Sequence, residues 1–334
     1  MPDAGKSTAR RTGSVVTVGE TMALLTAPSK GLHSGSHLPV GIGGAESNVA
    51  IGLARLGVPS TWISRIGADS FGALVTRELR AEGVRVIAQQ DPTAPTGLMV
   101  KEHRGGTPWR VRYYRNDSAA AQLTPDDLDE TAISEADVLH LTGITPALGS
   151  GPRLTIQRAI EIARTAGTLV SLDVNYRSTL WPPEEAGGVL SRLTSDGVDL
   201  LFAGPEEAAL LLGWDQQPVS SPTFEDGENL GRELVKLGPS TVVVKLGAVG
   251  SIAVQGDQSH RASTRPITVV DAVGAGDAFV AGYLSELVTG AAVPECLKMG
   301  NILGGAVCQQ PGDWEGLPTR NELEDPAFTG EVVR

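Results

Sequence analysis

Short apolar runs alternate with longer amphipathic stretches along most of the chain. From about residue 130 onward, each run of strand length is followed by a helical pattern, in the order Val138–Leu141, Leu154–Ala166, Leu169–Val174, Glu184–Leu193, Leu200–Phe202 and Glu206–Leu212. Apolar strands separated by helices are typical of a parallel sheet with helices on both faces. The pattern predicts an α/β protein with a doubly wound, mostly parallel sheet. An α/β barrel would give a similar pattern and remains the alternative.

The same rhythm continues toward the C-terminus. Its further predicted elements are Leu230–Leu237, Thr241–Leu246, Ser251–Val254, a strand at Ile267–Val270, a helix from about Ala278 to Val288 and a last helix near Pro294–Gln309. The segment Gln216–Asn229 is rich in Pro, Ser and Asp, which is typical of a surface loop.

The first third of the chain has a different pattern. Strand-like runs at Val15–Val18, Gly97–Lys101 and Trp109–Arg115 are joined partly by turns, while Ala45–Leu56 and Phe71–Ala81 are helical. We expect a small β-sheet lid, formed by segments within about residues 20–42 and 93–120, on one α/β domain that spans residues 14–325. Residues 1–13 are expected to be a flexible N-terminal tail.

The net charge, the cysteine content and the N-terminal residues argue against several classes of partner and location. The formal charge of −12 disfavours nucleic acid as a partner, since nucleic-acid proteins present a basic face. The only cysteines, Cys296 and Cys308, are too few for a disulfide framework and lack metal-site spacing, which favours a reducing cytoplasm. The first thirteen residues contain no apolar run, so we expect neither a secretion signal nor a membrane partner.

The segment Asp271–Asp277 carries the chemistry that the pattern predicts. It follows the expected strand at Ile267–Val270, and an apolar helix begins directly after it. Gly274 and Gly276 flank the small Ala275 at this helix N-terminus, where successive backbone N–H groups can form an anion hole for a phosphoryl group.

Asp277 lies beside the predicted anion hole. A carboxylate there could take a proton from a hydroxyl that attacks the γ-phosphate of ATP. The alternative is that Asp277 is an ordinary helix N-cap and that the glycines only serve a turn.

Two other glycine patterns do not fit their motifs. Ala4-Gly5-Lys6-Ser7-Thr8 has neither the earlier glycine nor the preceding strand of a P-loop. The pair Gly274 and Gly276 lacks the third small residue of a dinucleotide fingerprint, because Phe279 stands in its place.

A second glycine-rich segment, Gly43-Gly44-Ala45-Glu46-Ser47-Asn48-Val49-Ala50, stands far upstream of the Asp277 loop. Together the two segments resemble the paired signatures of the ribokinase-like (PfkB) carbohydrate kinases. The resemblance runs from about Val15 to about Pro318. It implies an α/β body, a β lid, ATP as phosphoryl donor and Mg²⁺, with Asp277 as catalytic base and Gly274, Ala275 and Gly276 as the anion hole.

Within that family, three segments are similar to the 2-keto-3-deoxygluconate kinases. They are Arg112-Tyr113-Tyr114-Arg115 with the nearby Ser118-Ala119-Ala120, then His140–Leu148, then Asp173–Trp181. The resemblance implies that substrate contacts come from Gly43, Gly44 and Asn48 of the body, from Tyr113 and Arg115 of the lid, and from Arg177.

The arginines fit a sugar acid as substrate. A guanidinium can hold a carboxylate by paired, charge-assisted hydrogen bonds, whereas a neutral sugar needs no such group. The alternative for Arg115 and Arg177 is a solvated strand edge or a structural ion pair.

The resemblance also implies a nucleotide site. Lys245, Gly247 and Gly250 belong to a strand and glycine turn that lie along ATP in the family, and Asn301 belongs to a helix that flanks the adenine. A plain strand followed by a turn explains the two glycines almost as well.

The chain departs from the family at a few positions. Gly204 replaces an Asn that helps to organise the water shell of Mg²⁺ in the family. Glu207 would then act on the metal through water. The alternative is that Glu207 is only part of a solvated acidic helix start. Met99 replaces a tyrosine that faces the substrate in some relatives. Asp313 matches a family element near the sugar, although it could equally be a turn residue.

The function that follows is ATP-dependent phosphorylation of the primary hydroxyl of a keto-deoxy sugar acid, foremost 2-keto-3-deoxygluconate, to its 6-phosphate. The alternatives are a kinase for a neutral sugar such as fructose or ribose, and a non-catalytic regulator that binds nucleotide or sugar. We also expect a homo-oligomer that forms through the β lid. The sequence leaves the sugar-acid epimer, the oligomer size and any monovalent-cation requirement open.

Overall fold

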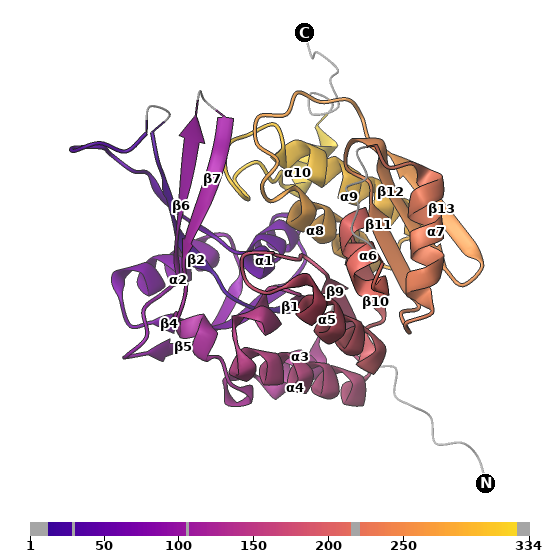
Figure 1. The fold of residues 1–334 in the computed structure, drawn as a ribbon, viewed down its shortest axis with the longest axis horizontal. Coiled ribbons are helices and arrows are strands. Elements are labelled where there is room, and N and C mark those ends of the chain that lie inside the picture. Colours follow the sequence, from indigo (N-terminus) through magenta and orange to yellow (C-terminus); the bar gives the residue numbers. More distant parts are fainter. Residues whose placement is uncertain (1–12, 29–30, 105–106, 215–220, 326–334) are drawn as a thin grey trace.

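The computed structural model describes residues 13–28, 31–104, 107–214 and 221–325. Residues 1–12 of the predicted tail and residues 216–220 of the predicted surface loop lie outside the described residues. The small second sheet rises from one side of the α/β body in Figure 1.

A nine-stranded sheet forms the centre of the molecule, in the order β13-β12-β11-β10-β9-β8-β1-β4-β5. Neighbouring strands are parallel from β11 to β5, and β12 and β13 are antiparallel additions at one edge. The strands are β1 (Val15–Val18), β4 (Ser60–Gly67), β5 (Arg85–Asp91), β8 (Val138–Thr142), β9 (Leu169–Asp173), β10 (Leu200–Ala203), β11 (Thr241–Lys245), β12 (Gly250–Gln255) and β13 (Gln258–Ser263). The sheet is open, with edge strands β13 and β5, which excludes the barrel alternative.

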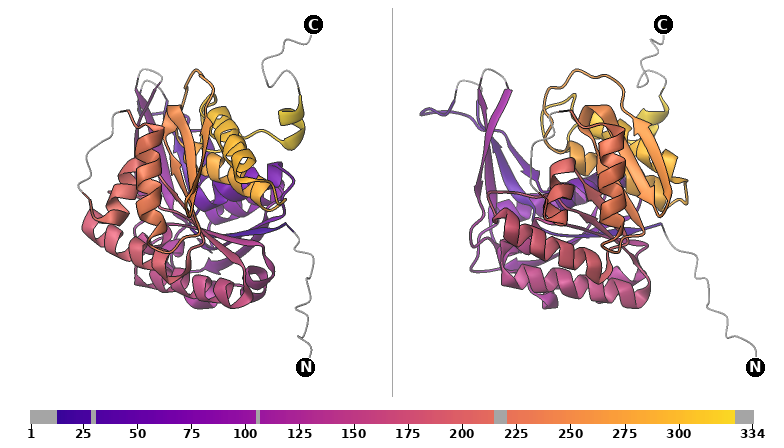
Figure 2. Two further views of the ribbon diagram at one scale, coloured as in Figure 1. Left: turned by 90° about the vertical axis from the view of Figure 1, so that its right-hand side faces the viewer. Right: turned by 45° about the vertical axis from the view of Figure 1, so that its right-hand side comes forward.

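The strands are apolar on both sides because helices cover both faces. In β11, for example, Val242 and Val244 pack into one core and Val243 into the other. Helices α3 (Glu130–Glu135), α4 (Ser150–Ala166), α5 (Pro183–Gly197), α6 (Pro205–Leu212) and α7 (Phe224–Val235) cover the first face, and α1 (Ala45–Arg55), α2 (Ser70–Ala81), α8 (Ala275–Leu287) and α9 (Val293–Val307) cover the second. Figure 2 shows the two helical layers with the sheet between them, which confirms the doubly wound fold.

A separate four-stranded sheet has the order β3-β2-β6-β7. Its strands are β2 (Met22–Thr26), β3 (Val40–Gly43), β6 (Leu98–Arg104) and β7 (Thr107–Tyr114). Met22, Leu24 and Met99 form a small buried cluster on it, with Val111 packed against them. This sheet is called the small sheet below.

Three sequence predictions need correction. The βαβ pattern does not begin at about residue 130, because β1, β4 and β5 already belong to the large sheet. Ile267–Val270 is not a strand: Val270 N–H bonds to the Cys308 carbonyl at the end of α9, and Val269 is 58% exposed. The predicted loop Gln216–Asn229 ends too late, because Thr223 caps α7 by accepting a hydrogen bond from Asp226 N–H.

Within the described residues, the structure contains no helix that is both long and apolar enough to cross a membrane.

Candidate active site

The predicted catalytic residues lie near the carboxyl ends of the strands, close to the point where the strand order of the large sheet reverses. Strands β8 to β11 follow one another outward on one side of β1, and β4 and β5 on the other. Crevices outside the carboxyl ends of the strands at such a switch point are where open α/β sheets bind ligands. β9 ends there at Asp173 and β11 at Lys245.

The loop before α8 contains a turn that only glycine can form. Gly274 has a φ of 79°, and a Cβ on it would overlap the carbonyl oxygen of Asp313, so this position requires glycine. Gly274 is also the N-cap of α8, and Asp277 lies in its first turn. The alternative that Asp277 is merely the N-cap is therefore wrong.

Asp277 is only 8% exposed and its two carboxylate oxygens each accept a side-chain amide hydrogen bond. Asn48 Nδ2 donates to Oδ2 at 2.8 Å, and Asn175 Nδ2 donates to Oδ1 at 3.2 Å. Burial raises the pKa of Asp277 to about 7, and the charge of Asp173 adds to the rise, although the bond from Asn48 and the positive charges of Arg177 and Lys245 oppose it. A carboxylate with this pKa is suited to accept a proton near neutral pH.

A charged pair lies close to Asp277. Lys245 Nζ contacts both carboxylate oxygens of Asp173, at 2.8 and 2.7 Å. Burial lowers the pKa of Lys245, but Asp173 and Glu207 outweigh it and raise the pKa above its ordinary value. A Cβ on Gly276 would lie 3.5 Å from Lys245 Nζ, which places the ammonium beside the predicted anion hole.

The predicted sugar-binding glycines lie against Asp313 and the start of the small sheet. A Cβ on Gly43 would lie 2.8 Å from Asp313 Oδ2 and would overlap Met99 Cε. A Cβ on Gly44 would overlap the Glu20 carbonyl oxygen. Asp313 is 6% exposed and its carboxylate accepts a hydrogen bond from Lys101 Nζ at 3.1 Å.

The two predicted carboxylate-binding arginines have different surroundings. Arg115 is buried and paired with the equally buried Glu20, and its guanidinium lies 5.8 Å from the centre of the Tyr113 ring. Arg177 is exposed, donates to the Tyr176 carbonyl and is close enough to lower the pKa of Asp277. Arg177 thus has an accessible charge near Asp277, whereas Arg115 already has a carboxylate partner.

Two of the predicted nucleotide residues, Gly250 and Asn301, lie against the Ala262 carbonyl of β13. Asn301 of α9 donates through its side-chain amide to the Ala262 carbonyl at 2.9 Å. A Cβ on Gly250 would overlap the same carbonyl oxygen, and Gly250 has a φ of 131°. Gly247 has a φ of 59° with open space around it. Gly250 therefore has a structural requirement of its own, and Gly247 borders free space.

Glu207 stands at the start of α6, where both of its carboxylate oxygens accept backbone N–H groups. Gly204 N–H donates to Oε2 at 2.7 Å and Tyr176 N–H to Oε1 at 3.0 Å. Each oxygen keeps a second lone pair for a water molecule. Among the residues that the structure describes, no three or more His, Cys, Asp or Glu side chains are grouped to hold a metal by themselves.

Sequence reasoning missed several residues of the site. Asp173 and Asn175 lie in a segment that the sequence singles out, yet it gave no role to them. Asn175 has a φ of 40°, a conformation that non-glycine residues rarely adopt and that clusters at functional sites. Lys101, which is 2% exposed, stands in the sequence only as part of a predicted strand.

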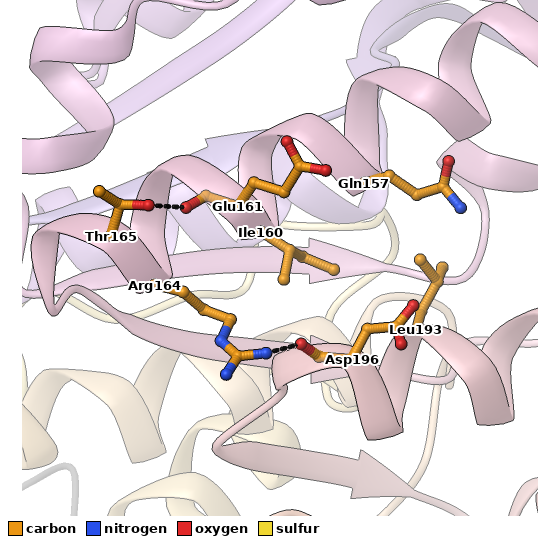
Figure 3. A pocket seen from close by; sticks show the side chains of 7 residues that line it. All are labelled: Gln157, Ile160, Glu161, Arg164, Thr165, Leu193 and Asp196. Carbon is orange, nitrogen blue, oxygen red and sulfur yellow. Dashed lines mark hydrogen bonds between the residues drawn. The ribbon is translucent and has the colours of Figure 1, made fainter.

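A surface hollow elsewhere contains none of the predicted site residues. Figure 3 shows it between α4 and α5, lined by Gln157, Ile160, Glu161, Arg164, Thr165, Leu193 and Asp196. The last turns of these helices lead to the amino ends of β9 and β10, so the hollow lies at the opposite edge of the sheet from Asp277.

A buried carboxylate with a raised pKa beside a glycine-lined helix N-terminus, at the switch point of a doubly wound sheet, defines a kinase-type site that acts on a hydroxyl group. The comparison with known families agrees with this class. The model of the pfkB family carbohydrate kinases matches residues 12–320, and the chain belongs to this family.

Curated relatives and solved structures are similar over nearly the full chain. The 2-dehydro-3-deoxygluconokinase of Bacillus subtilis (strain 168) is 38% identical over 92% of this chain and 93% of its own length. The 2-dehydro-3-deoxygalactonokinase of Haloferax volcanii is 34% identical over 86% of this chain and 89% of its own. The crystal structure of the Thermotoga maritima 2-dehydro-3-deoxygluconokinase has a TM-score of 0.82 and 28% identity, and it covers 93% of this chain and 97% of its own.

Proposed function

We infer that the protein transfers the γ-phosphoryl group of ATP to the primary hydroxyl of 2-dehydro-3-deoxygluconate, also called 2-keto-3-deoxygluconate, and gives the 6-phosphate. The observation that carries this proposal is the buried Asp277 between two amide donors, one turn into α8 and beside the Gly274–Gly276 amides. The similarity to kinases named for keto-deoxy sugar acids supports this choice of substrate.

In this mechanism Asp277 accepts the proton of the attacking hydroxyl. Asn48 and Asn175 hold the carboxylate in one orientation, so that it loses little freedom when it meets the substrate. The N–H groups of Gly274, Ala275 and Gly276 stabilise the charge on the transferring group, and the nearby ammonium of Lys245 adds positive charge.

The sugar carboxylate would be bound from Arg177, with Tyr113 reaching in from the small sheet. Arg177 is exposed at the crevice and Tyr113 is 39% exposed, so both are accessible to a ligand. A substrate carboxylate would meet Arg115 only in competition with Glu20. Gly43 at the end of β3 would line the sugar together with Gly44 and Asp313.

Mg²⁺ fits this site as an ion that arrives with the nucleotide. Mg²⁺ keeps several waters and is commonly held by substrate phosphates, and the second lone pairs of Glu207 can accept hydrogen bonds from such waters. When bound, the ion would neutralise charge on the phosphates.

Two further parts of the proposal concern self-association of the protein and its cellular compartment. Val40 and Tyr114 of the small sheet are 53% and 60% exposed, and a second copy of the chain that covered them would bury this apolar surface. Cys296 and Cys308 are free thiols, which is compatible with a reducing cytoplasm.

The test is ADP release with 2-keto-3-deoxygluconate, its galactonate epimer, fructose and ribose. We expect the two sugar acids to be preferred and Asp277→Asn to lower turnover by about 100-fold or more, the usual scale of general base catalysis. Arg177→Gln should raise KM for the sugar acids only, and Arg192→Gln on the exposed side of α5 is the matched control. Preference for a neutral sugar, or near-normal turnover of folded Asp277→Asn, would refute the proposal.

A further inference from the structure

Lys101 is a buried ammonium that connects the small sheet to the body. It lies on β6, is 2% exposed and contacts the carboxylates of Asp271 and Asp313, which belong to two loops far apart in the sequence. Burial lowers the pKa of Lys101, but the two carboxylates outweigh it and keep the pKa above its ordinary value. The group is therefore charged, and its two partners share one positive charge.

The contact with Asp271 reaches the anion hole through one hydrogen bond. Asp271 Oδ2 contacts Lys101, and the other oxygen, Oδ1, accepts the N–H of Val273 at 3.1 Å. Val273 directly precedes Gly274, the N-cap of α8. An ammonium that fixes the Asp271 carboxylate thus also fixes the backbone at the start of the anion hole.

The contact with Asp313 reaches the same loop from its other side. The Asp313 carbonyl packs so closely on Gly274 that no Cβ fits between them, and its carboxylate lies next to Gly43. Burial raises the pKa of Asp313, while Lys101 lowers it. Without the ammonium, two buried carboxylates would face each other at this point, which is costly in a dry environment.

We propose that Lys101 is a positioning residue that holds the Gly274–Gly276 loop in its phosphoryl-binding conformation by bridging Asp271 and Asp313. The inference rests on the proposed function for its catalytic consequence, but the bridge itself can be measured without catalysis. It also makes the loop conformation depend on the small sheet, because the ammonium comes from β6.

The first experiment compares wild type with Lys101→Met, which keeps an unbranched apolar side chain up to Cε and removes the ammonium group. Amide hydrogen exchange over residues 271–277 should rise by about tenfold or more, while exchange over residues 138–142 in the central strand β8 stays unchanged. Lys236→Met is the matched control, since Lys236 lies on the surface in an ion pair with Glu233. Unchanged exchange in the loop of Lys101→Met overturns the proposal.

The second experiment asks whether a free cation can replace the side chain. Lys101→Ala should lower kcat by about tenfold or more with a smaller change in KM for ATP, because the loop acts on the transition state. Propylammonium matches the atoms removed and should restore part of the lost turnover, whereas propanol should not. Equal effects of the two additives would reduce Lys101 to a packing role and overturn the proposal.

The proposal stays testable if Lys101→Met does not fold or if wild type is inactive on all four sugars. If Lys101→Met does not fold, Asp271→Asn weakens one half of the bridge and must still speed exchange over residues 271–277. If wild type phosphorylates none of the four sugars, the proposed function fails, while the exchange comparison still decides whether Lys101 fixes the loop.

Discussion

The side-chain amide of Asn48 donates a hydrogen bond of 2.8 Å to Oδ2 of Asp277, across 229 positions of sequence. The bond joins the two glycine-rich segments that the sequence analysis paired by resemblance. It also places Asn48, which was expected to bind sugar hydroxyls, on the carboxylate itself. The bond lowers the pKa of Asp277, while burial and the charge of Asp173 raise it.

The pH dependence of turnover should reflect this balance. Because only ionised Asp277 accepts a proton, kcat/KM for the sugar should fall about tenfold per pH unit below about pH 7. Asp173→Asn removes a charge that raises this pKa and frees Lys245, whose charge lowers it, so the fall should move to lower pH by about one unit.

The measurement is a series of kcat/KM values at one fixed ATP concentration, so that titration of the nucleotide affects both proteins equally. Asp257→Asn in the exposed turn between β12 and β13 is the control and should leave the profile in place. A profile of Asp173→Asn that moves to higher pH would contradict the assignment of the titrating group.

The free energy of unfolding should also depend on pH because of Asp277, but in the opposite direction to turnover. The pKa of Asp277 is about 7 in the folded protein, against an ordinary value of 3.8, so the folded state binds the extra proton between these pH values. The free energy of unfolding therefore falls as pH rises from about 4 to about 7. Asp277→Asn removes this dependence, and its stability relative to wild type should improve by about 3 kcal/mol between about pH 5 and pH 8.

Urea unfolding at the two pH values measures this difference. The asparagine also loses one acceptor for the amides of Asn48 and Asn175, but that loss is the same at both pH values and cancels. A constant stability difference between variant and wild type would show that Asp277 titrates near its ordinary pKa.

Most of the fold could be predicted from the sequence because its strands are apolar on both sides. Such runs stand out, and β8 to β11 were found near their observed bounds. The predicted strands were wrong where an apolar, β-branched run does not form a strand. Ile267–Val270 is β-branched and apolar like a strand, but it lies exposed beside the end of α9. The strands β2 and β3 of the small sheet are short, and β2 pairs with β6, which is distant in sequence.

Site residues could be predicted from the sequence only where the residues that act together lie in one contiguous segment. The Asp277 loop does so, because a glycine-rich helix start and its carboxylate are contiguous. Lys101 and Asn175 gave no such signal, since their partners are 170 or more and 102 positions away and only the folded chain brings them together. Arg115 shows the converse, because a motif that favoured a ligand also fits a buried pair with Glu20.

The pair of Arg115 and Glu20 should matter for stability. Both side chains are buried, so Arg115→Met leaves an unpaired carboxylate and should lower the free energy of unfolding by about 3 kcal/mol. Adding Glu20→Gln removes that charge and should recover most of the loss. A double-mutant cycle by urea unfolding measures the coupling, and additive single effects would mean that the two groups do not interact.

Gly274 and Gly276 should respond differently to alanine, although both belong to the anion hole. Gly274 has a positive φ and no room for a Cβ against the Asp313 carbonyl, so Gly274→Ala should cost about 2 kcal/mol or more of stability. Gly276 lies inside α8, where alanine is favoured by up to about 1 kcal/mol and the nearest atom to the new Cβ would be Lys245 Nζ at 3.5 Å.

Gly276→Ala should therefore keep or gain stability and still lose turnover by about tenfold or more, because its methyl group would stand where the transferring phosphoryl group must approach the amides. Thermal unfolding and ADP release on the same preparations measure the two effects separately. If Gly276→Ala turned over at the wild-type rate, its amide would not lie against the phosphoryl group, and the anion hole would have to be formed elsewhere on the loop.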